Sequence, residues 1–505
     1  MEGPRSAPGM MSPMLFFSCF CLLVGDMLFG FDTGSFGGIL GNPGFVRQFG
    51  AYSSVTQAWG FSSLHTSLLT SLPFIGKFLG CLLAGPWIER SGHRVVFFAL
   101  SVISVIGIIL EITAADTGPG TGRFVQFIVG RIIVYISVGL VEVNVTTYQS
   151  EIVPASLRGL VIVSLQLFLN VGGVLATGVN KAFSTSTTAK GWKTVTGIQF
   201  IFPVLIVFFT IFIPSSPRWL LSKDREEEAI VALRRLRSKA DATNGNCQAE
   251  ISAIREALHS HVHKAPWLDV VRSSNFHRTI IVMIYYFFQQ ATGQAFASTY
   301  QTVFYKTNGY ADHAFTYPVI SGCIALVGVL PAMYMVDKLG RRSCLMISFF
   351  LQGLWMYLLA GIGELSHKTP TEKNFVVAAF MLFGFSYNMG GASIPYLLGT
   401  ELPNAALREK TQAIGTSWNV LWAFVTNFAI PYMIADLHFQ LGWVFGSISV
   451  LALVFTFFFL PETKGRVLED IDNVFATSNN IFNQFKDPNG KVMREEAIET
   501  NGKDI

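Results

Sequence analysis

The chain has 505 residues, of which 51% are hydrophobic and only 13% are charged. A soluble domain carries about 25% charged residues, so this composition excludes an ordinary soluble protein and indicates a membrane protein. The net charge of +4 does not indicate a nucleic-acid-binding protein, because the basic residues lie mostly in loops between apolar segments.

Apolar runs of about 20 residues or more predict twelve membrane-spanning helices. We expect these spans, in chain order, at residues 14–40, 61–87, 94–114, 123–148, 157–181, 195–214, 279–305, 314–337, 343–363, 374–399, 410–434 and 439–461. The predicted fold class is therefore an all-α membrane protein with twelve transmembrane helices.

Three loop motifs occur twice at a common spacing of about 250 residues, which indicates a duplicated half. Each motif lies where a long apolar segment ends: Glu89–Arg94 and Asp337–Arg342, Glu151 with Arg158 and Glu401 with Arg408, and Pro214–Arg218 and Pro461–Arg466. Secondary transporters are built from internal repeats of this kind.

The repeat predicts an N-terminal unit of six spans at residues 14–214 and a C-terminal unit at residues 279–461. Between them, residues 215–278 form a charged insert that we expect to fold into short surface helices. Residues 1–13 and 462–505 flank the two units. Basic loop residues concentrate on the side of the insert, which predicts that the insert and both termini are cytoplasmic.

The repeated loop residues predict ion pairs at the cytoplasmic mouths of the helices. Basic residues alone would serve membrane topology, but topology does not explain the matched acids. Such pairs can lock one arrangement of the helices and release it in another. We expect one network in each half, made by Glu89, Arg90, Arg94, Glu151 and Arg158, and by Asp337, Arg341, Arg342, Glu401 and Arg408. Gly92 and Gly340 would permit the tight turns.

These motifs make the chain resemble the sugar porter family of the major facilitator superfamily, in particular its fungal members. Further motifs of the resemblance are Phe31–Gly34, Gly130-Arg131, Tyr148–Gly159, Pro217–Leu220, Gln289-Gln290 and Pro461–Glu469. The resemblance covers about residues 14–472. It implies the major facilitator fold, with two six-helix bundles around a central site and cytoplasmic helices after the sixth span.

A sugar offers hydroxyl groups and apolar ring faces, so its site requires side-chain amides and an aromatic ring. Four amides lie within otherwise apolar spans, and the resemblance places sugar-contacting residues at the same positions: Gln166, Gln289, Gln290 and Asn419. The alternative is helix–helix contact through buried amides.

The chain departs from common hexose carriers at several of these positions. Ala295 replaces a sugar-binding Asn, Gln294 offers a shifted amide, and Tyr300 keeps an aromatic ring. Tyr396 stands where a Trp is usual, and Ala423 replaces a second Asn. A disaccharide, a pentose, a polyol or a sugar-like acid such as quinate are therefore alternatives to glucose.

Asp32 and Arg131 are charged residues inside membrane spans, which are costly and mark functional sites. The resemblance implies that they couple sugar import to a proton, with a static structural pair as the alternative.

We expect no other cofactor and no metal, because the 6 cysteines show no zinc or disulfide spacing. We expect no enzymatic activity, because the sequence shows no motif typical of an enzyme. A facilitative carrier, a nutrient sensor and an exporter of a secondary metabolite are the alternative functions.

Lys77 lies inside the second span, where an unpaired ammonium would be costly. At ~1.5 Å per residue, Lys77 and Glu142 both fall about 14 Å from the inner surface, so we predict an ion pair between them. Asp26 is a rival partner, and extension of Lys77 to the membrane interface is the alternative. We expect the protein to be a monomer in the lipid bilayer of the plasma membrane.

Overall fold

The computed structural model describes residues 12–54, 57–116, 120–153, 158–237, 246–260, 267–403 and 407–464. A helical segment lies at each of the twelve positions predicted for a membrane span. The elements up to the sixth span are α1 (Pro13–Gly41), α2 (Pro43–Phe49), β1 (Ala51–Ser53), β2 (Ala58–Gly60), α3 (Ser63–Ser71), α4 (Pro73–Ser91), α5 (His93–Thr113), α6 (Thr121–Ile152), α7 (Arg158–Ala182), α8 (Ala189–Ile198) and α9 (Ile201–Phe212).

The charged insert contains short helices, as predicted, and the second series of spans follows it. These elements are α10 (Pro217–Leu221), α11 (Glu226–Leu236), α13 (Asn246–Ser260), η2 (Trp267–Val271), α14 (Ser273–Ala291), α15 (Gln294–Ser298), α16 (Gln301–Thr307), η3 (Ala311–His313), α17 (Thr316–Lys338), α18 (Arg341–Gly363), α19 (Pro370–Ser386), η4 (Tyr387–Gly391), α20 (Ile394–Glu401), α21 (Arg408–Leu437), η5 (His438–Gln440) and α22 (Leu441–Phe459).

Nine helical runs within the described ranges are long and apolar enough to cross a membrane. The last run, Lys410–Phe459, joins α21 and α22. The helix α7 and the series α14–α16 occupy the positions predicted for the fifth and seventh spans.

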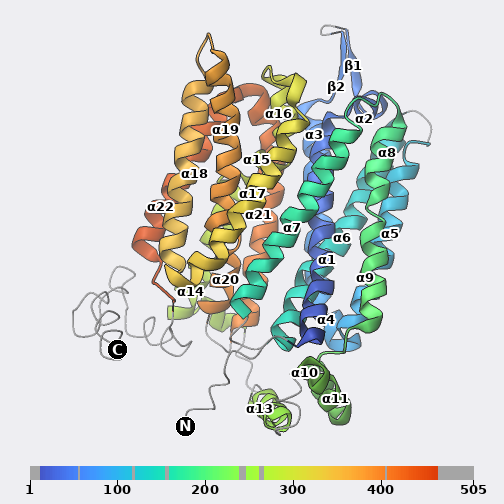
Figure 1. Ribbon diagram of the computed structural model, residues 1–505, viewed down its shortest axis with the longest axis vertical. Coiled ribbons are helices and arrows are strands. Elements are labelled where there is room, and N and C mark those ends of the chain that lie inside the picture. The colour runs from blue at the N-terminus through green and yellow to red at the C-terminus, as the bar shows by residue number, and fades with distance from the viewer. Residues whose placement is uncertain are drawn as a thin grey trace.

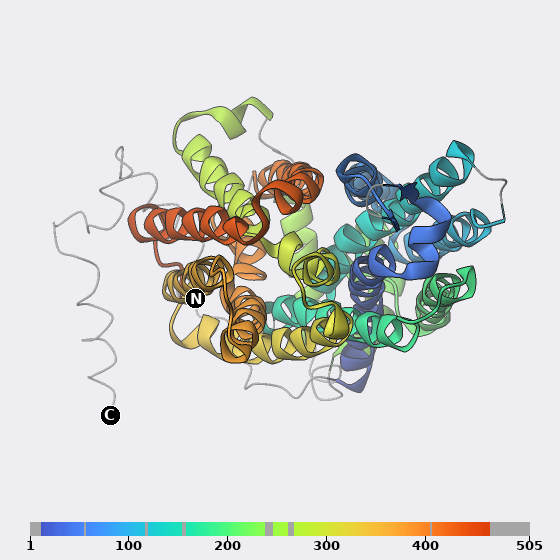
Figure 2. The same cartoon turned by 90° about the horizontal axis from the view of Figure 1, so that it is seen from above.

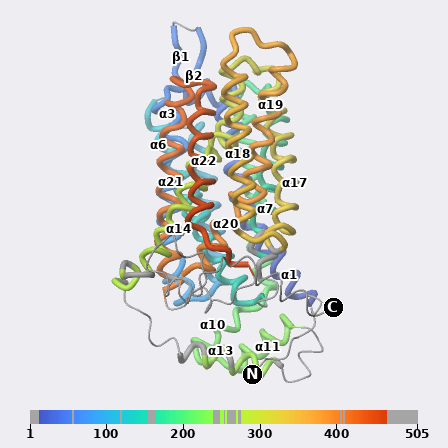
Figure 3. Tube along the Cα trace, turned by 90° about the vertical axis from the view of Figure 1, so that its left-hand side faces the viewer, coloured from blue at the N-terminus to red at the C-terminus, as the bar shows by residue number. Residues whose placement is uncertain are grey.

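The spans run along the long axis of the molecule (Figure 1). The β1–β2 hairpin lies at one end, which we call the hairpin side, and α10, α11 and α13 lie at the other, the insert side. Seen along this axis, the first and second series of spans form two groups side by side (Figure 2). Contacts between the groups include α7 with α17 and α3 with α21, and the tube view shows α3 and α21 together near the hairpin (Figure 3).

Four spans that hydropathy predicts as continuous helices are interrupted. The second is divided into α3 and α4, and the sixth into α8 and α9. The seventh span breaks after Ala291, where Gly293 takes a left-handed conformation with φ of 104°. The tenth is interrupted by the π-helical turn η4, a distortion that is frequent at functional sites. The sequence also did not predict α2 or the hairpin. Hydropathy reports how apolar a segment is, and these breaks change its backbone without changing its polarity.

Glycine gives the two repeated loop motifs their turns, as the sequence predicted. Gly92 and Gly340 have φ values of 81° and 92°, a region that other residues adopt only with strain. Each glycine directly precedes a span, at the starts of α5 and α18.

Close packing of α1 on α7 depends on Gly30, because a Cβ atom there would overlap the carbonyl oxygen of Leu169. Gly30→Ala is therefore expected to lower stability by about 1–3 kcal/mol through overpacking. The measurement is the yield and melting temperature of the purified protein. Gly85→Ala in α4 is the matched control, since a Cβ atom there meets nothing. Equal behaviour of the two variants would contradict this prediction.

Candidate functional site

A buried ion pair joins α1 to α6. Arg131 Nη2 lies 3.3 Å from Asp32 Oδ2, and the two side chains are 2% and 0% exposed. Asp32 Oδ1 accepts a hydrogen bond from Gln199 Nε2 at 3.2 Å. The guanidinium lies 3.7 Å from the centroid of the Phe36 ring and donates to Tyr135 Oη at 3.4 Å. Such a partner favours the charged form of a carboxyl, and its withdrawal favours the protonated form.

Glu111 belongs to the same buried cluster and was missed by sequence reasoning. It lies on α5, is 1% exposed, and interacts electrostatically with Arg131 and Asp32. Within the described residues its Oε1 has no hydrogen-bond partner. Arg131 therefore faces two carboxyl groups. The available signal was that Glu111 is the only acid in the third predicted span.

Three of the predicted amides form one hydrogen-bonded cluster. Asn419 Nδ2 donates to Gln289 Oε1 at 2.6 Å, and Gln290 Nε2 donates to Asn419 Oδ1 at 3.2 Å. Gln289 Nε2 donates to Ala392 O at 2.6 Å. The cluster joins α14, α21 and the segment before α20, and Gln290 is its half-buried member.

An aromatic pocket lies beside this cluster, between α14 and α21. It is lined by Ile280, Met283, Ile284, Phe287, Trp418 and Trp422. Phe287 and Trp422 are about one helical turn from Gln290 and Asn419, respectively. Trp422 Nε1 is buried without a hydrogen-bond partner among the described residues. The pocket thus offers aromatic ring faces, and the amides lie about one helical turn further along the same two helices. The sequence analysis did not single out either tryptophan.

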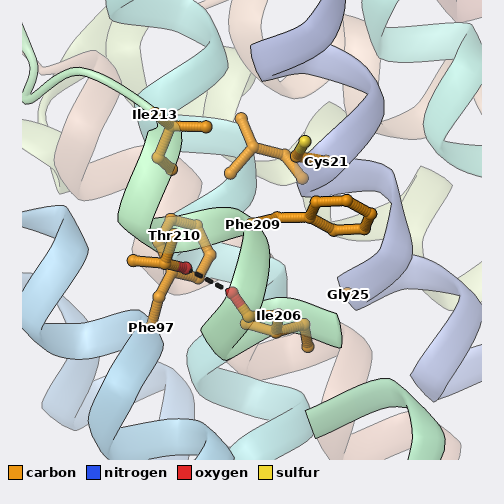
Figure 4. Close-up of a pocket in the computed structure, with 8 residues that line it drawn as sticks. Cys21, Gly25, Phe97, Ile206, Phe209, Thr210 and Ile213 are labelled. Atoms are coloured by element: carbon orange, nitrogen blue, oxygen red, sulfur yellow. Dashed lines mark hydrogen bonds between the residues drawn. The ribbon is translucent and has the colours of Figure 1, made fainter. Parts of the chain in front are cut away.

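A smaller pocket lies between α1, α5 and α9 (Figure 4). Its lining is apolar except for Cys21 and Thr210, and the Thr210 hydroxyl already donates to Ile206 O at 2.6 Å. This pocket does not match the hydrogen-bonding needs of a polar solute.

The fourth predicted amide, Gln166, reaches across to the other half. Gln166 Nε2 and Asn170 Nδ2 of α7 both donate to Asn388 Oδ1, at 3.1 Å and 2.7 Å. Asn388 lies in the π-helical turn η4, which bulges the tenth span at this level. Asn170 and Asn388 were missed, although each is an amide inside an apolar span.

Two other predicted substrate residues have protein partners instead. Gln294 Nε2 donates to Ser298 Oγ at 3.2 Å on its own helix. Tyr300 is 0% exposed, and its hydroxyl lies 2.6 Å from both Thr70 Oγ1 and Asn427 O. In this conformation Tyr300 presents no ring face to a solute, because it fills the contact between α3 and α21.

The structure brings Lys77 and Glu142 together, with Lys77 Nζ 2.9 Å from Glu142 Oε2. Lys77 also lies 4.6 Å from the centroid of the Phe29 ring and is 3% exposed. Tyr396, predicted to contact substrate, donates from α20 to Glu142 Oε1 at 3.0 Å. Tyr396 therefore links the two halves through this ion pair.

The predicted loop network in the N-terminal half has a different basic member. His93 Nε2 lies 3.0 Å from Glu151 Oε2, and the Ser216 hydroxyl donates to the same oxygen. Arg94, predicted as a member of this network, donates to backbone carbonyls at the end of α9. Its position one residue further along α5 turns it away from Glu151.

The C-terminal half repeats this arrangement at the equivalent positions. Arg341 Nη2 lies 2.9 Å from Glu401 Oε1, and Thr463 Oγ1 donates to Glu401 Oε2 at 2.6 Å. Arg342 Nη2 donates to Phe457 O, near the end of α22, at 2.6 Å. In both halves, the residue after the glycine pairs with the acid and the next residue binds a helix end.

The remaining predicted network residues are not all placed. Glu89 and Arg90 are exposed, and the backbone oxygen of Glu89 accepts from Trp219 Nε1 at 3.2 Å. The side chains of Arg158, Asp337 and Arg408 lie outside the part of the chain that the structure describes.

Comparisons with known proteins agree with this architecture. The family model "Sugar (and other) transporter" matches residues 18–475. The chain is 27% identical to a probable high-affinity hexose transporter of Schizosaccharomyces pombe, covering 85% of this chain and 83% of the relative. It is 27% identical to hexose transporter HXT8 of Saccharomyces cerevisiae, covering 94% and 83%. A high-affinity gluconate transporter of Schizosaccharomyces pombe is 26% identical, covering 90% and 82%.

Solved structures show the same fold. The proton:xylose symporter XylE bound to 6-bromo-6-deoxy-D-glucose matches with a TM-score of 0.76 and 23% identity, covering 92% of this chain and 100% of that one. The inward-open xylose transporter XylE from E. coli matches with a TM-score of 0.74 and 22% identity, covering 91% and 99%.

The prediction of an all-α, twelve-helix, multi-pass membrane protein is thus confirmed. Because the family model matches residues 18–475, the chain belongs to the Sugar (and other) transporter family.

Proposed function

We propose that this transporter imports a sugar or sugar-like solute by proton symport with alternating access. The observation that carries the substrate class is the set of amides beside the aromatic pocket. Gln290 can donate and accept at once, as a hydroxyl partner requires, and it is the half-buried member of the amide cluster. Relatives named as hexose and gluconate transporters support the same class.

The buried Asp32–Arg131 pair is the proposed coupling site, with the proton as coupling ion. In this proposal the Asp32 carboxylate is ionised while Arg131 is close, and it binds a proton when α1 and α6 move apart. A facilitative carrier remains the second candidate, because a pair that never separates would serve structure alone. The insert side is the proposed cytoplasmic side, and we propose a monomer in the plasma membrane.

Contacts between the halves support alternating access. On the hairpin side, Ser67 Oγ donates to Phe428 O at 2.6 Å, and Tyr300 bonds Thr70 and Asn427. On the insert side, the His93–Glu151 contact and the Arg341–Glu401 ion pair each stay within one half. In this conformation the two halves are therefore bonded to each other on the hairpin side.

The test is uptake of labelled hexoses, pentoses, disaccharides, polyols, aldonates and quinate in a transport-null host, with and without a protonophore. The proposal expects accumulation of at least one solute above its external concentration, and loss of that accumulation with protonophore. Uptake insensitive to both pH and protonophore would leave the facilitative carrier. Export of a preloaded compound without uptake of the panel would favour an exporter.

Gln290→Ala is expected to weaken the apparent affinity for the transported solute about tenfold, since a lost hydrogen bond to a hydroxyl costs about 1–3 kcal/mol. Initial uptake rates across solute concentrations measure this effect at equal surface expression. Gln294→Ala is the matched control and should change affinity less than about twofold, because Gln294 bonds its own helix. If Gln294→Ala has the larger effect, the solute binds nearer α15 than proposed.

A further inference from the structure

Apart from the Asp32–Arg131 pair, three ionisable side chains are in contact where the two halves touch, and a fourth, Asp26, lies close enough to interact with them electrostatically. Asp26 comes from α1, Lys77 from α4, Glu142 from α6 and Tyr396 from α20. Lys77 binds Glu142 Oε2, and the Tyr396 hydroxyl donates to Glu142 Oε1. Asp26 interacts electrostatically with Glu142. The cluster therefore contains one ammonium and two carboxyl groups.

The charges in this cluster do not balance if both carboxyl groups are ionised. Lys77 neutralises Glu142, and no cation is left for Asp26. The residue Asp26 is 9% exposed, and its Oδ2 has no hydrogen-bond partner among the described residues. An isolated buried carboxylate is so costly that the group takes up a proton instead.

Among the described residues, the elements packed on α1 supply no free positive charge to Asp26. Arg131 of α6 is already paired with Asp32. The helices α7 and α9, which pack on α1, carry ionisable side chains only at the ends of α7. On α4 and α14, the other titratable neighbours of Glu142 are Cys81 and Tyr286, and neither can be cationic.

We propose that Asp26, Lys77 and Glu142 form a second proton-binding site, with the proton on Asp26 in this conformation. Its binding forms an O–H bond on the Asp26 carboxylate and brings the cluster to zero net charge. The site deepens the proposed proton symport, and its role in transport rests on that function.

Tyr396 connects this site to the movement of the halves. It lies in the second half, whereas the other three residues lie in the first. When the halves part at this level, Glu142 loses the hydrogen bond that it accepts from Tyr396, so the surroundings of the two carboxyl groups change with the conformation. A site whose proton affinity differs between two conformations can couple a proton gradient to their exchange.

Infrared spectroscopy of the purified full-length protein tests the charge count, because a protonated carboxyl has its own C=O stretch. At neutral pH, Asp26→Asn should remove one such band, whereas Asp32→Asn should leave that band in place. Glu142→Gln should remove it too, since Asp26 is then the only carboxyl group left in the cluster to balance the Lys77 charge. Lys77→Met should add a band, because both carboxyl groups then need a proton.

A band unchanged in Asp26→Asn, or in Glu142→Gln if the first variant does not fold, would overturn the second site. The spectra need no substrate, so they separate this inference from the proposed function. If uptake proves independent of protons while the infrared series holds, the symport proposal fails and the buried proton site stands.

Discussion

Asp32→Asn is expected to abolish accumulation of the solute against its gradient, while exchange between equal concentrations on the two sides continues. The carboxylate is buried against Arg131 and Gln199, so it is placed to bind a proton when Arg131 withdraws. Asparagine keeps the shape and the Gln199 contact but cannot bind the proton. The accumulation ratio should fall to about one, the value for a passive carrier without a coupling ion.

The measurement is steady-state accumulation, paired with counterflow in preloaded vesicles. Asp116→Asn is the matched control, because Asp116 pairs with Lys193 on the surface and its side chain is 70% exposed. Surface pairs contribute about 0–1 kcal/mol, so this variant should accumulate solute normally. An Asp32→Asn protein that still accumulates solute would exclude Asp32 as the coupling site.

Lys77→Met should strongly lower folded yield and transport, because it leaves Glu142 without its cation in a buried site. Removing one partner of a buried ion pair costs about 3–5 kcal/mol, whereas replacing both partners with apolar residues is often neutral. The double variant Lys77→Met with Glu142→Leu should therefore recover much of the yield. Fluorescence-detected size-exclusion chromatography and melting temperature measure this recovery.

Lys193→Met provides the control for loss of a lysine, since its partner Asp116 is exposed to solvent. That variant should keep at least about half of the wild-type yield. If the double variant is no better than the worse of the two single variants, the pair is not the source of the instability. Tyr396→Phe, which removes one hydrogen bond to Glu142, should have an intermediate effect.

In the loop networks, sequence motifs predicted which acids are paired but not every basic partner. The repeated acids Glu151 and Glu401 were identified as ion-pair members from their spacing, and both are paired in the structure. The sequence did not identify His93 as the partner of Glu151. The choice between His93 and Arg94 depends on the direction of each side chain after the Gly92 turn, which the motif does not specify.

The sequence by itself determined the properties that depend on position along a span. Hydropathy and length located the twelve helices, the repeat divided them into halves, and depth along the spans placed Lys77 level with Glu142. Asp32 and Arg131 stood out because charges are rare in apolar segments. Each of these inferences needs only local composition and a rise per residue.

Only the tertiary structure decided which side chains meet across helices. In the structure Asn388 binds Gln166, Tyr396 binds Glu142, and Tyr300 is buried between α3 and α21. These contacts depend on the rotation of each helix about its axis and on how the halves approach. A break such as η4 changes that rotation along the tenth span. Hydropathy carries no record of rotation, because every face of a membrane helix can be apolar.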